Sequence, residues 1–202
     1  IDGTCLGVAD TPANAEHFGR PGVTKGERSA FPQARVVALA ECGTHAMFAA
    51  KVGTYGQSEA TLTEPLLQAL EPGMLLTADR AFFSYALWRR AIGTGADLLW
   101  RVRTDSAGPK PTHLDDLADG SWLAHLRSNA TAAARRQEPM LVRVVDYTID
   151  DGRANAVSYR LFTTLTDPEE VSASELAAAY THRWEIEVAF DELKTRQRGP
   201  RT

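Results

Sequence analysis

Residues 180–194 read Tyr-Thr-His-Arg-Trp-Glu-Ile-Glu-Val-Ala-Phe-Asp-Glu-Leu-Lys. At about 100° per residue this stretch predicts an amphipathic α-helix. Within a sector of roughly 60° on one face of that helix lie four polar side chains, Tyr180, Arg183, Glu187 and Lys194. An apolar stripe beside the sector is formed by Ile186, Ala189, Phe190 and Leu193. The stripe is expected to face a hydrophobic core.

The helix has recognisable limits. Ser172 and Glu175 have the spacing of a capping box, in which two side chains satisfy the first free backbone N–H groups. Gly199-Pro200 is typical of the residues that follow a helix. Glu185 and Glu192 point away from the polar sector, so both are expected to be solvated.

The polar face combines groups that suit chemistry on phosphates. A carboxylate such as Glu187 is an oxygen ligand of the kind that Mg²⁺ prefers. A phenol, a guanidinium and an ammonium group can hold phosphates along a strand. Charged helix faces are usually only solvated. Four residue types at the fixed spacing Y-x2-R-x3-E-x6-K are, however, much harder to obtain by chance, and they favour a functional site over a solvated helix face.

Two further acidic residues lie on predicted strands. Ile1-Asp-Gly-Thr-Cys-Leu6 predicts a short strand that carries Asp2. The apolar run before Asp79 predicts a buried strand whose carboxyl end bears that acid, where open α/β sheets bind ligands. Asp10 competes with Asp2, but it lies in a stretch to about residue 33 that predicts a long loop. Asp2 could also be a turn residue, and Asp79 could be an ion-pair partner of Arg80 or Arg89.

The order of elements indicates the fold class. Hydrophobic periodicity and turn residues predict strands at 1–6, 35–41, 45–52, 74–80 and 97–103, and helices at 58–70 and 82–91. With the closing helix this gives an α/β fold, a ribonuclease-H-like mixed sheet flanked by helices. A hairpin at 140–147 and 156–165 predicts a β-rich insertion between the last strand and the last helix. The expected division is a core at 1–103, the insertion at 104–168 and the closing part of the core at 169–202.

Composition restricts the remaining possibilities. No run of about 18 apolar residues is present, so we expect no membrane span. Cys5 and Cys42 lack metal-ligand spacing and are expected to be reduced core residues of a cytosolic protein. The chain opens on Ile1 without a targeting region and is expected to be a fragment. The net charge of −4 disfavours DNA binding, although clustered carboxylates at a metal site and a basic segment at 194–202 weaken that objection.

These motifs together resemble bacterial insertion-sequence transposases of the DDE class, the group called insertion-sequence family four. The helix spacing is similar to the Y-R-E-K signature of that family, and Asp2-Gly-Thr and Asp79-Arg-Ala-Phe-Phe match its other acidic motifs. The similarity also covers Phe18-Gly-Arg-Pro-Gly22, Phe31-Pro-Gln and Glu41-Cys-Gly-Thr-His45.

The resemblance implies a DNA transposase that cuts an insertion element out of double-stranded DNA and joins it to a target. Asp2, Asp79 and Glu187 would be catalytic and would hold two Mg²⁺ ions, for which Mn²⁺ can substitute. The implied DNA-binding residues are Tyr180, Arg183, Lys194, Arg80 and Arg20. A homodimer on paired terminal inverted repeats and a cytoplasmic, nucleoid-associated location are also implied.

Several alternatives remain open from the sequence. A metal-dependent nuclease that never joins ends would carry the same residues, and so would an inactive or truncated regulator that only binds DNA. Relatives that form a DNA hairpin flip a base onto an aromatic side chain. Candidates for that side chain are Trp122, Trp184, Tyr147 and Tyr159. In the loop before residue 33, further cations that could contact phosphates or simply be solvated are Lys25, Arg28 and, just beyond it, Arg35.

Overall fold

The computed structural model describes residues 1–21, 31–128, 131–149 and 157–197. The chain forms two compact units, a first unit of residues 1–69 and 184–202 and a second unit of residues 70–183. The chain therefore leaves the first unit after its first third and returns to it in the closing helical segment. None of the helices in the described ranges is long and apolar enough to cross a membrane.

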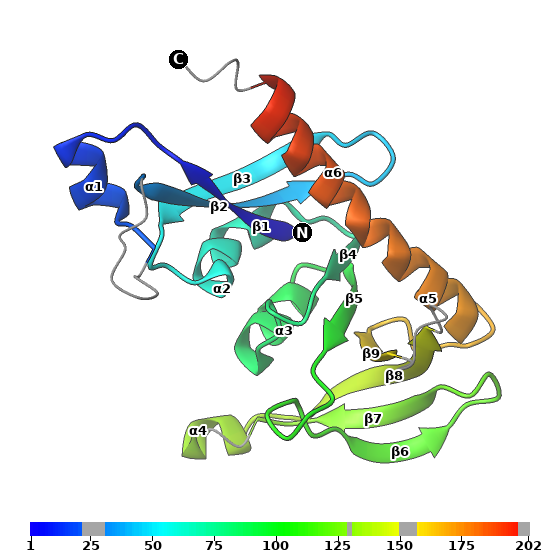
Figure 1. Ribbon diagram of the computed structural model, residues 1–202. Helices are drawn as coiled ribbons and strands as arrows, with labels where there is room; N and C mark the ends of the chain where they lie inside the picture. The colour runs from blue at the N-terminus through cyan, green and yellow to red at the C-terminus, as the bar shows by residue number, and fades with distance from the viewer. Residues whose placement is uncertain (22–30, 129–130, 150–156, 198–202) are drawn as a thin grey trace. The chain divides into compact units, whose positions relative to one another are not determined.

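The first unit is built on a three-stranded antiparallel sheet with the order β1-β2-β3 (Figure 1). Its strands are β1 (Asp2–Gly7), β2 (Gln33–Ala40) and β3 (Met47–Thr54). The register places Asp2 opposite Ala38. This confirms the predicted strand at the start of the chain and the predicted hairpin that follows.

Helices cover both faces of this sheet. One face of β2 packs against α6 (Glu185–Glu192), where Val36 and Ala38 form a cluster with Ile186 and Phe190. The other face carries α2 (Glu59–Thr63) and the 3₁₀ turn η1 (Glu64–Ala69), with Leu62 against the backbone of Gly53. The predicted helix at 58–70 is therefore shorter than expected, because Pro65 cannot continue the α-helical hydrogen bonds.

The stretch between β1 and β2 is not the structureless loop that its composition suggested. It contains α1 (Pro12–Phe18), in which Thr11 accepts a hydrogen bond from the backbone N–H of Asn14 and Pro12 opens the first turn. A threonine cap followed by proline favours a helix start even in a polar segment. Lys25 and Arg28, named as possible phosphate contacts, lie outside the described residues.

The second unit is built on a six-stranded mixed sheet with the order β4-β5-β9-β8-β7-β6. Its strands are β4 (Leu75–Ala78), β5 (Asp97–Val102), β6 (Thr112–Asp116), β7 (Trp122–Leu126), β8 (Met140–Ile149) and β9 (Val157–Thr163). β4 and β5 are parallel, and all other neighbours are antiparallel. This mixed sheet with flanking helices is compatible with the predicted ribonuclease-H-like class.

Helices also cover both faces of the second sheet. α3 (Tyr85–Ile92) packs Trp88 against Trp100, with ring centroids 5.1 Å apart. α5 (Ala173–Thr181) lies on the opposite face, where Leu176 and Tyr180 pack on Leu99, Val145 and Leu161. The alternation of β5 explains the arrangement, because Leu99 and Trp100 are neighbours that point to opposite faces. A short helix, α4 (Ala132–Arg135), precedes β8.

The β-rich segment at 104–168 extends the sheet of β4 and β5 instead of forming a sheet of its own. The predicted hairpin is confirmed as β8 and β9, and β9 pairs with β5. Its turn lies outside the described residues. Whether this segment is an insertion into a core of residues 1–103 and 169–202 stays a prediction. The strands that precede or carry the two aspartates belong to different sheets, β1 with Asp2 to the three-stranded sheet and β4 before Asp79 to the six-stranded sheet.

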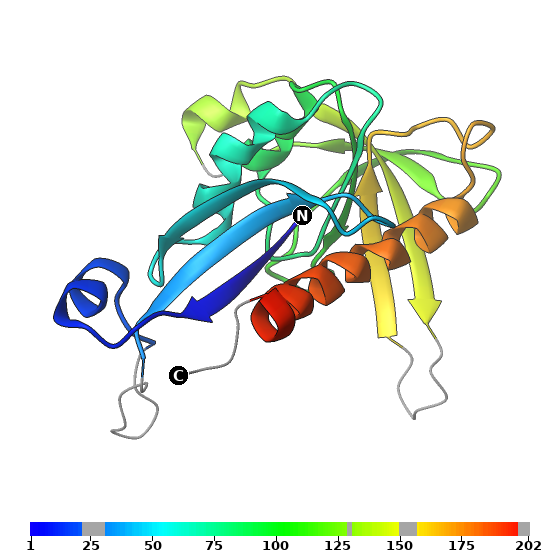
Figure 2. The same ribbon diagram turned by 90° about the horizontal axis from the view of Figure 1, so that it is seen from above.

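The closing helical segment is interrupted. The predicted single helix is divided into α5, the 3₁₀ turn η2 (His182–Trp184), α6 and the π-helical turn η3 (Leu193–Gln197). The capping box of Ser172 and Glu175 is confirmed. In Figure 2 the segment runs from orange to red, and the chain passes from the second unit to the first within η2. Non-α turns inside a helix are common at functional hinges.

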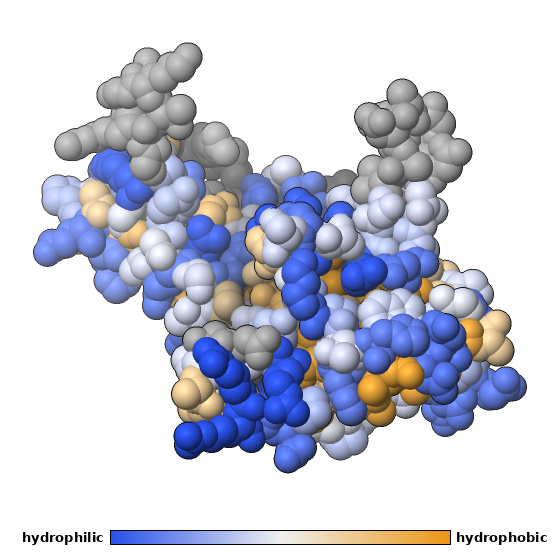
Figure 3. Space-filling view, turned by 90° about the horizontal axis from the view of Figure 1, so that it is seen from below, coloured by the Kyte–Doolittle hydropathy of each residue, from blue (hydrophilic) through white to orange (hydrophobic). Residues whose placement is uncertain are grey.

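One face of the molecule shows how polar and apolar side chains are distributed over it. Polar side chains dominate the face drawn in Figure 3, and apolar ones are visible only in small patches. Cys5 is half-buried and Cys42 is exposed in the turn before β3, so the expectation that both are core residues was wrong for Cys42. The two thiols do not form a disulfide.

Candidate active site

Asp79 follows β4 directly, as the apolar run before it predicted. Its carboxylate is partly open to solvent and makes two polar contacts inside the second unit. The hydroxyl of Tyr180 donates a hydrogen bond to Oδ1 over 3.3 Å. The guanidinium of Arg101 lies 3.6 Å from the same oxygen. Asp79 thus contacts Tyr180, the first residue of the Y-R-E-K helix motif, which lies 101 positions further along the chain.

Tyr180 is held in this contact by the core. Only 4% of its surface is exposed, and its ring packs on Leu99, Val145 and Leu161. Burial and the negative charge of Asp79 raise the pKa of the Tyr180 phenol, and the positive charges of Arg183 and Arg101 only partly oppose that effect. Tyr180 therefore remains a neutral hydrogen-bond donor at any physiological pH.

Arg101 is a residue of this cluster that the sequence analysis did not single out. It lies one position beyond the last residue of β5 that pairs with β4, so its side chain shares a face with Asp79. Its guanidinium also stacks over the ring of Tyr159, 4.1 Å from the centroid. A signal was available in the sequence, because Arg101 interrupts an apolar strand two positions after Leu99.

Two of the four aromatic candidates adjoin this cluster. Tyr159 stacks on Tyr147 with ring centroids 5.2 Å apart and planes inclined by 19°. Burial, and to a lesser extent Tyr159, raise the pKa of Tyr147, while Arg101 lowers it. Trp122 stacks on His113 instead, and Trp184 is 57% exposed. Tyr159 is therefore the candidate that contacts the Arg101 partner of Asp79.

Arg183 is buried instead of projecting into solvent. Its exposed fraction is 6%, and its guanidinium carbon lies 5.9 Å from the centroid of the Tyr180 ring. The 3₁₀ turn η2 contains it. Within the second unit, Arg183 therefore belongs with Tyr180, Asp79 and Arg101 to one group of polar side chains at the end of α5.

In the first unit, Asp2 lies on the sheet face that α6 covers. Directly opposite residues of an antiparallel pair point to the same face, and Asp2 is opposite Ala38. Ala38 packs against Ile186 and Phe190 of α6. Asp2 also accepts a hydrogen bond from the N–H of Gly3 over 2.8 Å. The first acid and the helix of the third acid therefore share one side of this sheet.

Glu187 is half-buried on α6, between the buried residues Ile186 and Ala189. The apolar stripe is confirmed, since Ile186, Ala189 and Phe190 are buried and Leu193 packs beside them. The expectation that Glu185 is only solvated was wrong. Its carboxylate contacts Nε2 of His45 at 2.6 Å and ties α6 to the turn between β2 and β3. His45 lies in that turn with a positive φ of 58°.

The remaining predicted DNA contacts are mixed in exposure. Arg80 and Lys194 are exposed, the latter in η3. Arg20 is ion-paired with Asp10 in the α1 region. Asp10, the competitor of Asp2, is thus an exposed loop acid with a cationic partner. Arg35 is ion-paired with Glu59 at 3.2 Å and donates to the carbonyl of Tyr55, which gives it a structural role.

A buried ion pair supports the end of the sheet where α5 begins. Arg143 is fully buried, and its guanidinium lies 2.5 Å from Asp119 and 2.8 Å from the hydroxyl of Ser121. It also donates to the carbonyls of Leu165, Asp167 and Val171. Burial disfavours the Asp119 carboxylate, but hydrogen bonds from Ser121 and from the N–H of Ala173, with the charge of Arg143, lower its pKa to about 2.

The proposed ligands are divided between the units. Asp2 and Glu187 belong to the first unit and Asp79 to the second. In the parts of the chain that the structure describes, three or more acidic, histidine or cysteine side chains do not gather into an ion-holding group. The three carboxylates nevertheless fit a hard cation by chemistry, because each is an oxygen donor that is partly open to solvent.

Comparison with known proteins identifies the family. A model of the transposase DDE domain matches residues 1–202. The chain belongs to the transposase DDE domain family. The resemblance seen in the motifs is thereby confirmed. Domains of this family generally use divalent metal ions.

Two curated relatives of this transposase domain come from Escherichia coli (strain K12). The transposase InsG for insertion sequence element IS4 is 29% identical over 200 residues, which are 98% of this chain and 44% of the relative. The putative transposase InsZ is 28% identical over 100 residues, or 50% of this chain and 33% of the relative. The chain thus spans less than half the length of these relatives.

Proposed function

We propose that this chain is the catalytic domain of an insertion-sequence transposase that cuts DNA at element ends and transfers the freed strand to a target. The observation that carries the proposal is the contact between Tyr180 and Asp79. It joins the helix motif to the strand-end acid, as a shared reaction centre requires. The family match over residues 1–202 supports the same reading.

The proposed reaction centre combines Asp2, Asp79 and Glu187. The position of Asp2 on the α6 side of its sheet supports the inclusion of Glu187, since both belong to the first unit. Three carboxylates at one place repel one another unless cations compensate their charge. Two Mg²⁺ ions, for which Mn²⁺ can substitute, would supply that compensation and would polarise the phosphodiester and the attacking oxygen.

The other residues would position the DNA. The Tyr180 hydroxyl and the Arg101 guanidinium hold one oxygen of Asp79, which fixes the orientation of that carboxylate. Arg80, Lys194 and Arg20 would contact phosphates, and the first two are already exposed. Arg183 and Tyr180 are buried, so a direct phosphate contact would require DNA to reach the end of α5.

The partner of the domain would be double-stranded DNA that carries terminal inverted repeats, and the active species would be a homodimer on paired ends at the nucleoid. If the path includes a DNA hairpin, the stacked pair of Tyr147 and Tyr159 is the aromatic surface that best suits an unstacked base. The support is its contact with Arg101, the partner of Asp79.

Two glutamates of α6 provide the decisive experiment. Glu187→Gln should reduce DNA cleavage with Mg²⁺ or Mn²⁺ by about a hundredfold or more while duplex binding is retained, because a ligand of the ions is lost. Glu185→Gln is the matched control, since Glu185 binds His45 and should leave cleavage largely intact. Nicked products without joined strands would favour the nuclease. Equal inactivity of the unmodified chain and Glu187→Gln would favour the DNA-binding regulator.

A further inference from the structure

A basic surface of the second unit begins beside the candidate active site. Arg80 directly follows Asp79, and it lines a pocket of about 280 Å³ with Arg103, Gly108 and Pro109. Two aromatic rings, of Phe83 and Tyr85, form the floor of that pocket together with Ser84 and Ala107. The pocket therefore contains two guanidinium groups. That of Arg80 follows the acid that is proposed to be catalytic, and that of Arg103 is ion-paired with Asp105 at 2.6 Å.

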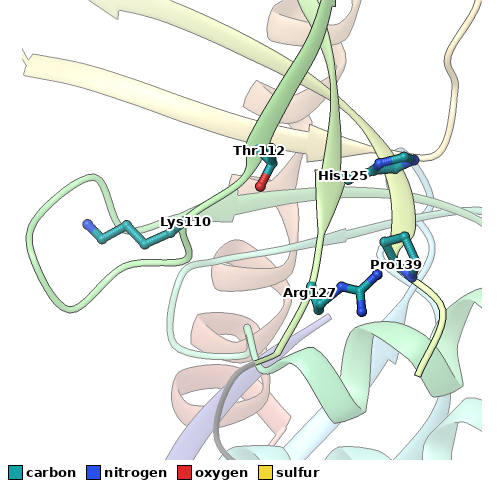
Figure 4. Close-up of a pocket in the computed structure, with 5 residues that line it drawn as sticks. All are labelled: Lys110, Thr112, His125, Arg127 and Pro139. Carbon is teal, nitrogen blue, oxygen red and sulfur yellow. The ribbon is translucent and has the colours of Figure 1, made fainter. Parts of the chain in front are cut away.

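A second pocket is lined by the residue that follows Pro109 in the chain. It has a volume of about 290 Å³ and is lined by Lys110, Thr112, His125, Arg127 and Pro139 (Figure 4). Pro109 lines the first pocket and Lys110 the second, so one segment of the chain contributes to both. The backbone N–H of Lys110 donates a hydrogen bond to the hydroxyl of Tyr85, the first residue of α3. This bond attaches the segment at Pro109 and Lys110 to α3.

The sheet register brings two of the lining residues of this second pocket together. Thr112 of β6 is directly opposite His125 of β7, and His125 is opposite Leu141 of β8. His125 lies on β7, and Arg127 directly follows the end of that strand. Both are exposed, while the intervening Leu126 is fully buried. The outer face of this edge of the sheet is therefore the polar one.

The cations of the second pocket carry charge that local carboxylates do not cancel. The ammonium of Lys110 donates to the carbonyl of Asp105 over 3.2 Å, and the guanidinium of Arg127 donates to the carbonyl of Arg135 over 2.8 Å. Among the residues that the structure describes, these two cations contact carbonyl oxygens and no carboxylate. From 120 to 137 the sequence has three arginines and no acid, although the whole chain has a net charge of −4.

We propose that this basic track, defined as Arg80, Lys110, His125 and Arg127, binds the phosphate backbone of duplex DNA that leads away from the bond to be cut. The inference rests on the proposed function, because it uses Asp79 as the place where the track begins. Exposed lysine and arginine side chains bind phosphates without reading the base sequence. The carbonyl contacts hold Lys110 and Arg127 in place without neutralising them.

The salt dependence of DNA binding tests the track. The whole chain is titrated with a fluorescently labelled duplex of arbitrary sequence at several salt concentrations. Each lost phosphate contact reduces the slope of log affinity against log salt by about 0.9. Lys110→Gln/Arg127→Gln should therefore reduce the slope by about 1.8 and weaken binding at 0.1 M salt about 60-fold. Lys51→Gln, on exposed β3 of the first unit, removes one charge elsewhere and should leave the slope unchanged.

The outcomes separate the track from the proposed function. Lys110→Arg/Arg127→Lys keeps both charges and should retain the slope, which distinguishes lost charge from lost structure. If the double variant Lys110→Gln/Arg127→Gln has the same slope of log duplex affinity against log salt as the unmodified chain, the track is overturned. Metal-dependent DNA cleavage by the unmodified chain would in that case still support the proposed function. If the unmodified chain binds no duplex, both the track and the proposed function are overturned.

Discussion

The hydroxyl of Tyr180 lies 3.3 Å from Oδ1 of Asp79, and the two residues come from segments that are far apart in the chain. The contact is made on the α5 face of the second sheet, where β4 and β5 end side by side. It shows that a helix motif and a strand-end acid, each recognisable by itself, meet in the folded protein. Arg101 completes the group from the neighbouring strand.

Removal of that hydroxyl should have a modest and specific effect. Tyr180→Phe keeps the buried ring on Leu99 and Leu161 but loses the hydrogen bond to Asp79. The free energy of unfolding should fall by about 1 kcal/mol, measured by urea denaturation. Tyr147→Phe removes a phenol from the stacked pair and leaves the Asp79 contact intact. An unchanged free energy of unfolding for Tyr180→Phe would contradict a stabilising hydrogen bond from Tyr180 to Asp79.

Asp119 makes stability depend on acid pH. Its pKa is lowered to about 2, so the folded state favours the carboxylate more than the unfolded chain does. The stabilisation is complete above the unfolded pKa of about 4 and is lost as the pH falls toward 2. The loss should be on the order of 2 kcal/mol, since only 18% of the side chain is exposed. Thermal unfolding is measured between pH 5 and pH 2, and the stability of Asp119→Asn should depend less on pH than that of the unmodified chain. Identical pH dependence in the two proteins would show that Asp119 does not cause the loss of stability in acid.

Arg143 should be among the most sensitive positions of the second unit. Arg143→Met leaves Asp119 without its cationic partner and three backbone carbonyls before α5 without their donor. Loss of one partner of a buried ion pair typically costs about 3–5 kcal/mol. Arg160→Met is the matched control, because its pair with Asp146 is more exposed and should contribute less than about 1 kcal/mol. Equal denaturation midpoints for the two variants would show that the buried network is not essential.

The pair of His45 and Glu185 should couple the β2–β3 turn to α6. Both side chains are about one-third exposed, so a double-mutant cycle of His45→Gln and Glu185→Gln should give a coupling of about 0.5 kcal/mol. The measurement is the free energy of unfolding of the two single variants and the double variant. Strict additivity of the single changes would mean that the 2.6 Å contact contributes nothing to the attachment of α6.

Local patterns predicted the elements that carry the chemistry. The apolar stripe of α6, the capping box at Ser172 and the position of Asp79 after β4 all depend on residues close in sequence, and each is confirmed. The 3₁₀ turn η2 was not predicted, because the helical periodicity of the surrounding residues continues through it. The helix α1 was hidden by a polar composition that is typical of loops.

Contacts between segments that are far apart in the chain could not be predicted from the sequence. Arg101 meets Asp79 only because β4 and β5 are parallel and in register, and Glu185 meets His45 across 140 positions. The network of Arg143 likewise requires the 119–121 turn and the segment before α5 to fold onto β8. Single charged residues on strands and helices resemble solvated ones until the partner strand is known. The combination of Asp2, Asp79 and Glu187 stays a prediction for the same reason.

The most direct test of the account is the location of bound metal. Crystals of the chain with Mn²⁺ and duplex DNA would reveal the ions by anomalous scattering. The account predicts Mn²⁺ coordinated by carboxylate oxygens of Asp2, Asp79 and Glu187 at about 2.1–2.2 Å. Mn²⁺ that is bound without one of these three residues, or three carboxylates too far apart to share ions on the DNA, would contradict it.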